Sequence, residues 1–180
     1  MKIVDRPIPG VLVIEPKVFG DARGFFLESY NHRVMCELGI TEPFVQDNHS
    51  FSAKNVLRGL HYQLQKPQGK LVRVATGEIL DAVVDMRRSS SSFGRSYAVR
   101  LSEENKWMMW VPPGFAHGFR VMSESAHVLY KATDFYAPEL ERSLLWNDPA
   151  LGIDWQLDGD PILSEKDRRG IPLQQAETYE

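Results

Sequence analysis

The sequence of 180 residues contains a single cysteine and no long apolar run. Cys36 has no second cysteine with which to form an intramolecular disulfide, which fits a reducing cytosol and predicts a cytoplasmic location. No stretch approaches the roughly 20 apolar residues that a membrane-spanning helix needs. The start of the chain, MKIVDRPIPG, also lacks the apolar core of a signal peptide. These absences predict that the protein has no membrane partner.

Basic residues are not in excess either. The chain has 21 Lys and Arg against 24 Asp and Glu, a formal net charge of −3. A nucleic-acid-binding surface usually needs a basic excess, so no nucleic-acid partner is expected. Apolar residues make up 43% of the chain, which is enough for a globular core. The length predicts a single domain over residues 1–180.

Helical periodicity is scarce, and short apolar segments separated by Gly and Pro recur every eight to twelve residues or so, a spacing typical of a β-sandwich or barrel. The clearest expected strands are Val11–Pro16, Glu78–Met86, Tyr97–Leu101, Met108–Val111 and His127–Tyr136.

Only two short helices are expected. Asn31 can cap the first, Asn31–Leu38, which would end at Gly39. Ser164 begins the second, which would end near Gly170. The tail that follows is expected to be loosely held.

The most informative stretch is Val56–Lys70, which reads VLRGLHYQLQKPQGK. His61 can exchange a proton near neutral pH, Lys70 can stabilise a developing oxyanion, and Arg58 is suited to grip a phosphate. A core histidine beside two surface cations is the structural alternative. In a regular strand Arg58 and His61 would point to opposite faces, but Gly59 permits a bulge that re-aims Arg58.

Two further segments have both a structural and a functional interpretation. Val45–Ser50 is polar at almost every position, and a strand there would place Gln46, Asn48 and Ser50 on one face. That face predicts either hydrogen bonds to a ligand or an exposed edge. The aromatic segment Phe19–Tyr30, FGDARGFFLESY, predicts either ordinary sheet packing or a stacking platform for a base.

Two motifs resemble the cupin double motif. The second, PPGFAHGF, is intact and contains His117, but in the first, GLHYQ, Gln63 stands where a second histidine is usual. No acidic residue lies between positions 61 and 77, where the family's ligand glutamate would sit. A transition metal needs at least three fixed ligands. The resemblance therefore implies an all-β, cupin-like jelly roll (a β-sandwich or barrel with a few short helices) without a metal ion or other cofactor.

Over nearly its whole length the chain resembles the dTDP-4-dehydrorhamnose 3,5-epimerase family of sugar-nucleotide epimerases. The matching segments, in order, are FGDARGFFLESY, FVQDNHS, NVLRGLHYQ, QGKLVR, VPPGFAHGF, LYKATDFY, WNDP and LSEKD. The resemblance implies inversion of carbons 3 and 5 of dTDP-4-dehydro-6-deoxy-D-glucose through an enolate, in rhamnose biosynthesis.

Three alternatives remain open at this point. A related epimerase that inverts one centre only would have the same base, acid and lysine. A metal-dependent cupin, such as a dioxygenase, is opposed by Gln63 and the missing glutamate. A non-catalytic sugar-binding cupin would have no need of a base and an opposed acid.

The resemblance also implies roles for individual residues. His61 corresponds to the base, Asp167 to the partner that orients its imidazole, Lys70 to the group that holds the enolate oxygen, and Tyr130 to the proton donor. Sequence alone does not place Asp167 near His61. Ser164 and Asp167 also form an S-x-x-D capping box, and both readings can hold.

Eight further residues correspond to positions that bind the dTDP-sugar in the family. These are Arg23, Phe26, Glu28, Gln46, Asn48, Arg58, His117 and Tyr136, of which Tyr136 would stack on the base. The resemblance also implies a homodimer, because the Arg23–Glu28 segment of such relatives reaches the site of the neighbouring subunit.

Overall fold

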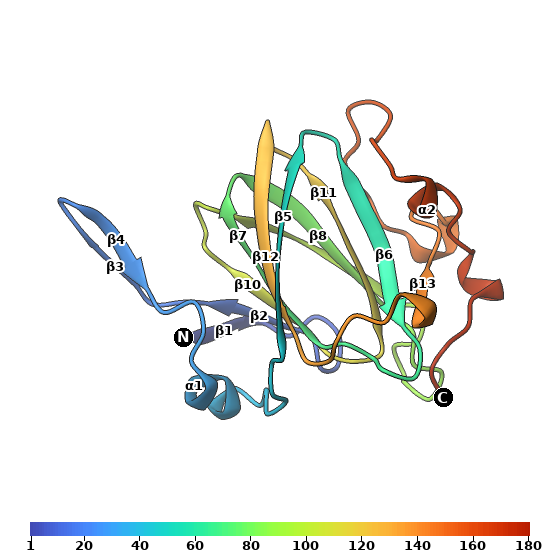
Figure 1. Ribbon diagram of the computed structural model, residues 1–180, viewed down its shortest axis with the longest axis horizontal. Coiled ribbons are helices and arrows are strands. Elements are labelled where there is room, and N and C mark those ends of the chain that lie inside the picture. The colour runs from blue at the N-terminus through green and yellow to red at the C-terminus, as the bar shows by residue number, and fades with distance from the viewer.

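The computed structural model describes all 180 residues, and its strands form two large antiparallel sheets and a separate two-stranded hairpin (Figure 1). The first sheet has six strands, in the order β1 (Lys2–Asp5), β2 (Leu12–Glu15), β10 (Met108–Val111), β7 (Lys70–Thr76), β12 (Ser125–Ala132) and β5 (Gln46–Ala53). The second has five, in the order β13 (Glu141–Ser143), β6 (Leu57–Gln63), β11 (Phe115–Val121), β8 (Glu78–Asp85) and β9 (Ser96–Ser102). The predicted all-β, cupin-like sandwich with few helices is confirmed.

The apolar side chains form three buried clusters that follow the alternation of the strands. The central cluster lies between the sheets, where Val72 and Val128 of the first sheet pack with Val83 and Phe119 of the second. A second cluster, which includes Leu80, covers the outer face of the five-stranded sheet with the carboxyl-terminal segments. Because successive residues of a strand point to opposite faces, β8 is buried on both sides.

The third cluster joins helix α1 (His32–Glu37) to the outer face of the six-stranded sheet, where Met35 packs with Trp110. The helix matches the prediction closely. Asn31 caps it by accepting from Val34 N at 3.4 Å, and Gly39 follows with a φ of +94°. The second helix, α2 (Glu165–Arg168), begins as predicted at the Ser164 cap.

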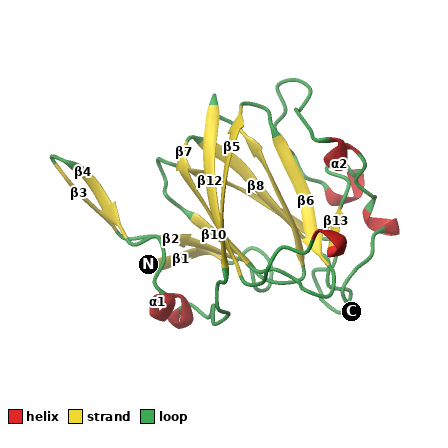
Figure 2. Cartoon of the chain, viewed as in Figure 1, coloured by secondary structure: helices red, strands yellow, loops and turns green.

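Short 3₁₀ turns complete the helical content, at Pro138–Leu140, Pro149–Leu151 and Leu173–Gln175. All the helical segments lie at the periphery of the sheets (Figure 2). None of the helices combines the length and apolar character needed to cross a membrane.

Two expectations about the chain after β12 are wrong. The strand ends at Ala132 and does not continue to Tyr136, because the chain turns where Thr133 Oγ1 accepts from Gly69 N at 2.8 Å. The tail is not loosely held: Tyr179 donates from its backbone N to Met86 O at 3.0 Å, and Ala176 is buried.

A separate hairpin projects away from the two sheets (Figure 1). It consists of β3 (Val18–Asp21) and β4 (Gly24–Leu27), and we call residues 18–27 the arm. Three phenylalanines of the arm are more than half exposed: Phe19 at 52%, Phe25 at 62% and Phe26 at 65%. Exposed aromatic rings in this number are typical of an interaction surface.

Candidate active site

A cavity of about 410 Å³ opens between the two sheets and is lined mainly by polar side chains. Strands β5, β7 and β12 form one wall, and β6 and β11 form the other, with α2 and β13 at the rim. The charged and hydrogen-bonding groups that line it are Gln46, Asn48, Ser50, Arg58, His61, Gln68, Lys70, His117, Tyr130, Tyr136, Glu141, Ser164, Lys166 and Asp167.

A bulge in β6 brings Arg58 and His61 to the same cavity. His61 pairs with His117 and Arg58 with Phe119, so β6 has one residue more than β11 between these two pairs. Gly59, in the bulge, has a φ of +109°, and a Cβ added there would lie 2.7 Å from Gly118 Cα. A side chain is therefore excluded at this position, and the predicted re-aiming of Arg58 by Gly59 is confirmed.

His61 and Asp167 are hydrogen-bonded, which the sequence alone did not establish. His61 Nε2 lies 2.6 Å from Asp167 Oδ1, and Asp167 is only 3% exposed. Burial raises the pKa of this carboxyl, but hydrogen bonds from His61, Ser164 and the Gly59 amide outweigh burial and lower the pKa overall. An ionised carboxylate only accepts, so Nε2 carries the proton and Nδ1 is left with a free lone pair.

The capping box and the histidine contact exist together. Ser164 Oγ accepts from Asp167 N at 3.2 Å and donates to Asp167 Oδ2 at 2.7 Å. Ser164 therefore fixes the Asp167 carboxylate, and this carboxylate in turn fixes the His61 imidazole. Both readings of the LSEKD motif are confirmed as contacts.

Lys70 lies in the opposite wall, at the start of β7. Its side chain is partly buried, and no carboxylate lies within ion-pair distance of its ammonium. Burial lowers its pKa to about 8, an effect that the more distant charges of Glu141 and Asp81 only partly offset. An ammonium held without a partner in a cavity is available to an anionic ligand.

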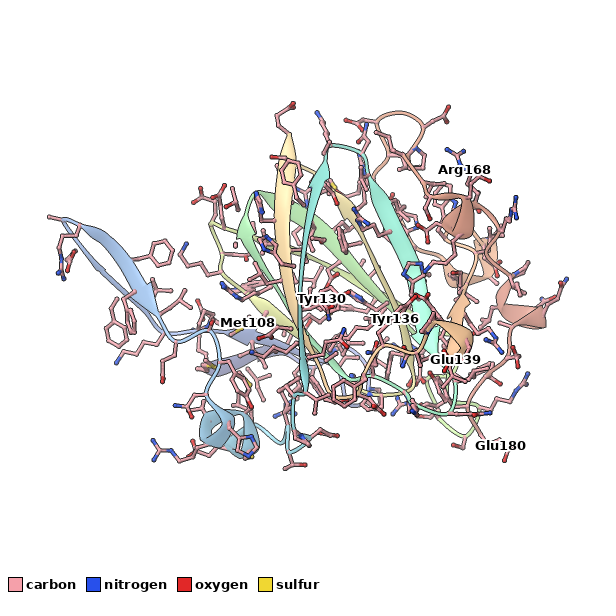
Figure 3. All side chains as sticks on the ribbon, viewed as in Figure 1. Met108, Tyr130, Tyr136, Glu139, Arg168 and Glu180 are labelled. Carbon is pink, nitrogen blue, oxygen red and sulfur yellow. The ribbon has the colours of Figure 1, made fainter.

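Tyr130 is on the same wall as Lys70, because Lys70 pairs with Ala132, two residues along β12. Burial and the charge of Glu141 raise the pKa of its hydroxyl, although Arg58 acts in the other direction. The hydroxyl therefore keeps its proton at neutral pH. Figure 3 shows Tyr130 on β12 and Tyr136 in the loop that leads to β13.

The face of β5 that carries Gln46, Asn48 and Ser50 points into the cavity, as predicted for a ligand-binding strand. Gln46 Nε2 donates to Asn48 Oδ1 at 2.9 Å, and Gln46 Oε1 accepts from Tyr136 N at 3.0 Å. Ser50 Oγ is buried and has no hydrogen-bond partner. A buried hydroxyl without a partner is a candidate contact for a bound ligand.

Arg58 on β6 and His117 on the neighbouring strand β11 are each held by a hydrogen-bond partner. Arg58 is exposed and donates from Nε to Ser52 Oγ at 2.9 Å, which fixes its guanidinium without neutralising it. His117 is buried and has its Nε2 2.7 Å from Asp81 Oδ1. His117 therefore forms a second histidine–carboxylate pair beside the first.

Sequence reasoning missed Glu141 and Lys166. Glu141 accepts from the Tyr136 hydroxyl at 2.7 Å and from Lys166 Nζ at 2.8 Å. Glu141 Oε1 lies 3.9 Å from His61 Nδ1. Its strand, β13, is three residues long and carries no apolar alternation, so nothing in the sequence marked it. Lys166 lies within the LSEKD motif, in which only Ser164 and Asp167 were predicted to have a role.

The residues of the cupin motifs do not fit a metal site. No group of three or more His, Cys, Asp or Glu is arranged to hold a metal ion. Gln63, which replaces the second histidine, is buried and donates to Lys66 O at 2.9 Å and to Phe135 O at 3.2 Å, while its Oε1 accepts from Ala137 N at 2.8 Å. Its amide anchors the loop after β12 and leaves no donor set for a metal.

Three of the predicted binding residues are not in this cavity. Arg23 and Phe26 belong to the arm, and Glu28 follows it. Arg23 is bound to Asp21 within the hairpin, and Glu28 accepts from Asn31 Nδ2 at 3.0 Å. Within one chain the arm points away from the cavity, so these residues do not join the other nine.

Comparisons with known proteins agree with this geometry. The family model described as dTDP-4-dehydrorhamnose 3,5-epimerase matches residues 5–175. The enzyme of that name from Pseudomonas aeruginosa is 57% identical over 180 residues, which cover 99% of each protein. A crystal structure of dTDP-6-deoxy-D-glucose-3,5-epimerase from Legionella pneumophila, in complex with dTDP-4-keto-L-rhamnose, is 50% identical with a TM-score of 0.95 and covers 98% of this chain and 94% of that one.

A single-centre enzyme is more distant. The 3′-monoepimerase ChmJ from Streptomyces bikiniensis, solved with dTDP-quinovose, is 31% identical with a TM-score of 0.87, over 94% of this chain and 86% of that one. The resemblance carried by the eight sequence segments is thus confirmed along almost the whole chain. Together with the two sheets and the cavity between them, these matches show that the chain belongs to the dTDP-4-dehydrorhamnose 3,5-epimerase family.

Proposed function

We propose that the cavity performs the reaction of this family with His61 as the base, Lys70 as the oxyanion partner and Tyr130 as the acid. The reaction is the inversion of carbons 3 and 5 of dTDP-4-dehydro-6-deoxy-D-glucose, which gives dTDP-4-dehydro-L-rhamnose. The observation that carries the assignment is the hydrogen bond between His61 Nε2 and Asp167 Oδ1, because it leaves Nδ1 as the free base in the cavity.

Proton abstraction requires a base, and a proton next to a ketone is acidic only when the enolate is stabilised. His61 Nδ1 takes the proton from the carbon next to the ketone, and the C–H electron pair becomes the enolate, with its negative charge on oxygen. The buried Asp167 stabilises the imidazolium that forms. The Lys70 ammonium, which has no carboxylate partner, neutralises the enolate oxygen.

Inversion requires that the new proton arrive from the other face of the sugar. His61 lies on β6 of the five-stranded sheet and Tyr130 on β12 of the six-stranded sheet, so they occupy opposite walls of the cavity. The Tyr130 hydroxyl gives its proton to the carbon and is recharged from solvent. The raised pKa of this hydroxyl keeps the proton available at neutral pH.

The remaining polar groups of the cavity suit a nucleoside diphosphate. Arg58, held at Nε by Ser52 and at Nη2 by Phe51 O, binds the diphosphate with the remaining N–H groups of its guanidinium, and His117 lies beside it. Tyr136, half exposed at the rim, stacks on the thymine base, and Gln46 and Asn48 hydrogen-bond to the nucleotide.

The arm completes the site of a second copy of this chain. Its exposed phenylalanines and the position of Arg23, Phe26 and Glu28 outside their own cavity support a homodimer in which each arm reaches the partner's site. We further propose that residues 1–180 act as one domain, without a metal, in cytoplasmic rhamnose biosynthesis.

The assignment is tested by proton NMR of the sugar in D₂O with the wild-type protein and with His61→Asn. The wild type should label both carbons. The variant should neither exchange nor invert, while it still binds thymidine diphosphate in calorimetry; removal of a general base costs roughly 10² to 10⁴ in rate. A His61→Asn protein that kept most of its rate would remove His61 from the mechanism.

A further inference from the structure

If His61 is the only base, inversion of both carbons requires that His61 lose a proton during each turnover. After the first inversion His61 holds a proton on both ring nitrogens and cannot act again. Before the second abstraction the proton on Nδ1 must leave, while the sugar is still in the cavity. A group next to Nδ1 that connects with solvent would meet this demand.

Asp167 cannot be that group. Its carboxylate is buried, and both oxygens are already bonded, Oδ1 to His61 Nε2 and the Gly59 amide, Oδ2 to the Ser164 hydroxyl. Asp167 also contacts the other ring nitrogen, and so it does not face the proton that was taken from the sugar.

Glu141 faces the correct nitrogen. Its Oε1 lies 3.9 Å from His61 Nδ1, the other acidic contact of the imidazole besides the 2.6 Å bond to Asp167. A gap of 3.9 Å closes to hydrogen-bond length with a small side-chain rotation or is bridged by one water molecule. Glu141 Oε2 points to the rim, where it accepts from Tyr136 and from Lys166.

The rim groups connect Glu141 with solvent. The Lys166 side chain is 48% exposed and Tyr136 is 51% exposed, while Glu141 itself keeps 13% of its side chain exposed. A proton that reaches Glu141 is therefore one step from water. The two hydrogen bonds also hold the carboxylate in place, so its orientation toward His61 does not depend on the substrate.

We propose that Glu141 accepts the proton from His61 Nδ1 between the two inversions and delivers it to solvent. This inference rests on the proposed function of His61. In the first transfer the Nδ1–H bond breaks and an O–H bond forms on Glu141, which returns a neutral imidazole with its free lone pair on Nδ1. In the second transfer the protonated carboxyl gives the proton to water, and the carboxylate is restored.

The electrostatic surroundings of Glu141 favour rapid release of the proton from its carboxyl group to water. Burial raises the pKa of this carboxyl, but the hydrogen bonds from Lys166 and Tyr136 and the charge of His61 lower it overall. An acid whose pKa lies below its ordinary range releases its proton to water readily.

The test is Glu141→Gln, which keeps the length of the side chain and an oxygen that accepts from Tyr136 and Lys166 but cannot take up a proton. Rapid-quench samples in D₂O, resolved by NMR, should show a first inversion within about threefold of the wild type. The second should slow by about tenfold or more, so that a singly inverted sugar accumulates. Added imidazole buffer should restore the second inversion in proportion to its concentration.

The matched control is Glu139→Gln, which makes the same change on an exposed side chain two residues away and should alter neither rate. A parallel fall of both inversions in Glu141→Gln, without rescue by imidazole, would show that Glu141 only positions its neighbours. Unchanged rates would also overturn the inference. Failure of the proposed function would give other results: the wild type would label one carbon only, or His61→Asn would remain active.

Discussion

His61 and Asp167, although 106 residues apart in the sequence, are joined by a 2.6 Å hydrogen bond between Nε2 and Oδ1. The bond connects β6 of the five-stranded sheet to the short helix α2 near the carboxyl terminus. It fixes which ring nitrogen of His61 can act as a base. The proposed reaction depends on this pair more than on any other contact.

Asp167→Asn should lower the rate of inversion by roughly 10² to 10⁴. An amide in place of the carboxylate removes the charge that stabilises the imidazolium and can bond Nε2 as a donor, which would leave the proton on Nδ1. Binding of thymidine diphosphate should change little, because Asp167 is buried behind His61. Steady-state kinetics and calorimetry would show the split, and a variant with wild-type turnover would contradict the pairing.

The lowered pKa of Lys70 predicts that the rate of inversion falls as the pH rises above neutrality. Burial lowers its pKa from 10.5 to about 8, so the ammonium is lost as the pH rises through about 8, and the rate should fall on the alkaline side with an apparent pKa near this value. Lys70→Met should be slower by roughly 10² or more at neutral pH, because the enolate loses its counter-charge. A wild-type rate that is flat from pH 7 to 10 would contradict this role.

The lowered pKa of Lys70 also predicts that a variant without this buried ammonium is more stable than the wild type at neutral pH. Between pH about 8 and 10.5 the unfolded chain binds the Lys70 proton and the folded chain does not, so this residue makes stability rise with pH across that window and penalises folding below it. Lys70→Met should therefore raise the free energy of unfolding at pH 7 by an amount on the order of 1–3 kcal/mol. Urea titrations of both proteins at pH 7 and pH 10 measure the difference. A destabilised variant at pH 7 would refute the prediction.

Much of the fold was predictable, because its signals are local. The short, mostly apolar segment Glu78–Met86 and the punctuation by Gly and Pro identify strands that the structure confirms as β8 and its neighbours. Asn31 and Ser164 predicted both helix starts correctly. The strand β1 and the packed tail around Tyr179 were missed, since both depend on distant partners that local pattern does not reveal.

The site was predictable in part for the same reason. Motif resemblance named nine residues that line the cavity, and Gly59 indicated the bulge that turns Arg58 inward. Glu141 was missed because its three-residue strand carries no apolar pattern. Its importance comes from its contact with His61, which is distant in the sequence. The functional role of the arm was predicted only from the resemblance to the family.

The hydrogen bonds of Gln63 lead to the prediction that activity is independent of metal. This amide, which stands where the cupin motif usually has a second histidine, is bonded to Lys66 between β6 and β7 and to Phe135 and Ala137 in the loop after β12. Activity should therefore survive exhaustive dialysis against EDTA and 1,10-phenanthroline, and elemental analysis of active protein should find less than stoichiometric metal. Loss of turnover on chelation, with recovery on addition of Zn²⁺, Fe²⁺ or Mn²⁺, would end this account.

The arm predicts complementation between two inactive variants. Arg23→Ala damages the arm and His61→Asn damages the cavity, so each homodimer has two defective sites. If the arm completes the partner's cavity, half the dimers in a co-expressed mixture are mixed, and one site in each is intact. About a quarter of wild-type activity should return. If the arm serves its own chain, no site is intact and the mixture stays inactive; light scattering on each variant confirms that the dimers persist.

The proposed mechanism has His61 and Tyr130 acting from opposite walls of the cavity, and Tyr130→Phe in D₂O tests it most directly. The change keeps the ring and removes only the hydroxyl, which makes no hydrogen bond within the chain, so folding should be little affected. His61 should still remove protons, and Lys70 should still hold the enolate. Without an acid on the opposite wall, deuterium should return from the original face. NMR of the sugar should then show exchange that outpaces inversion, with recovered substrate labelled, whereas the wild type inverts both carbons and labels both. Double inversion by Tyr130→Phe at a near wild-type rate would contradict the account.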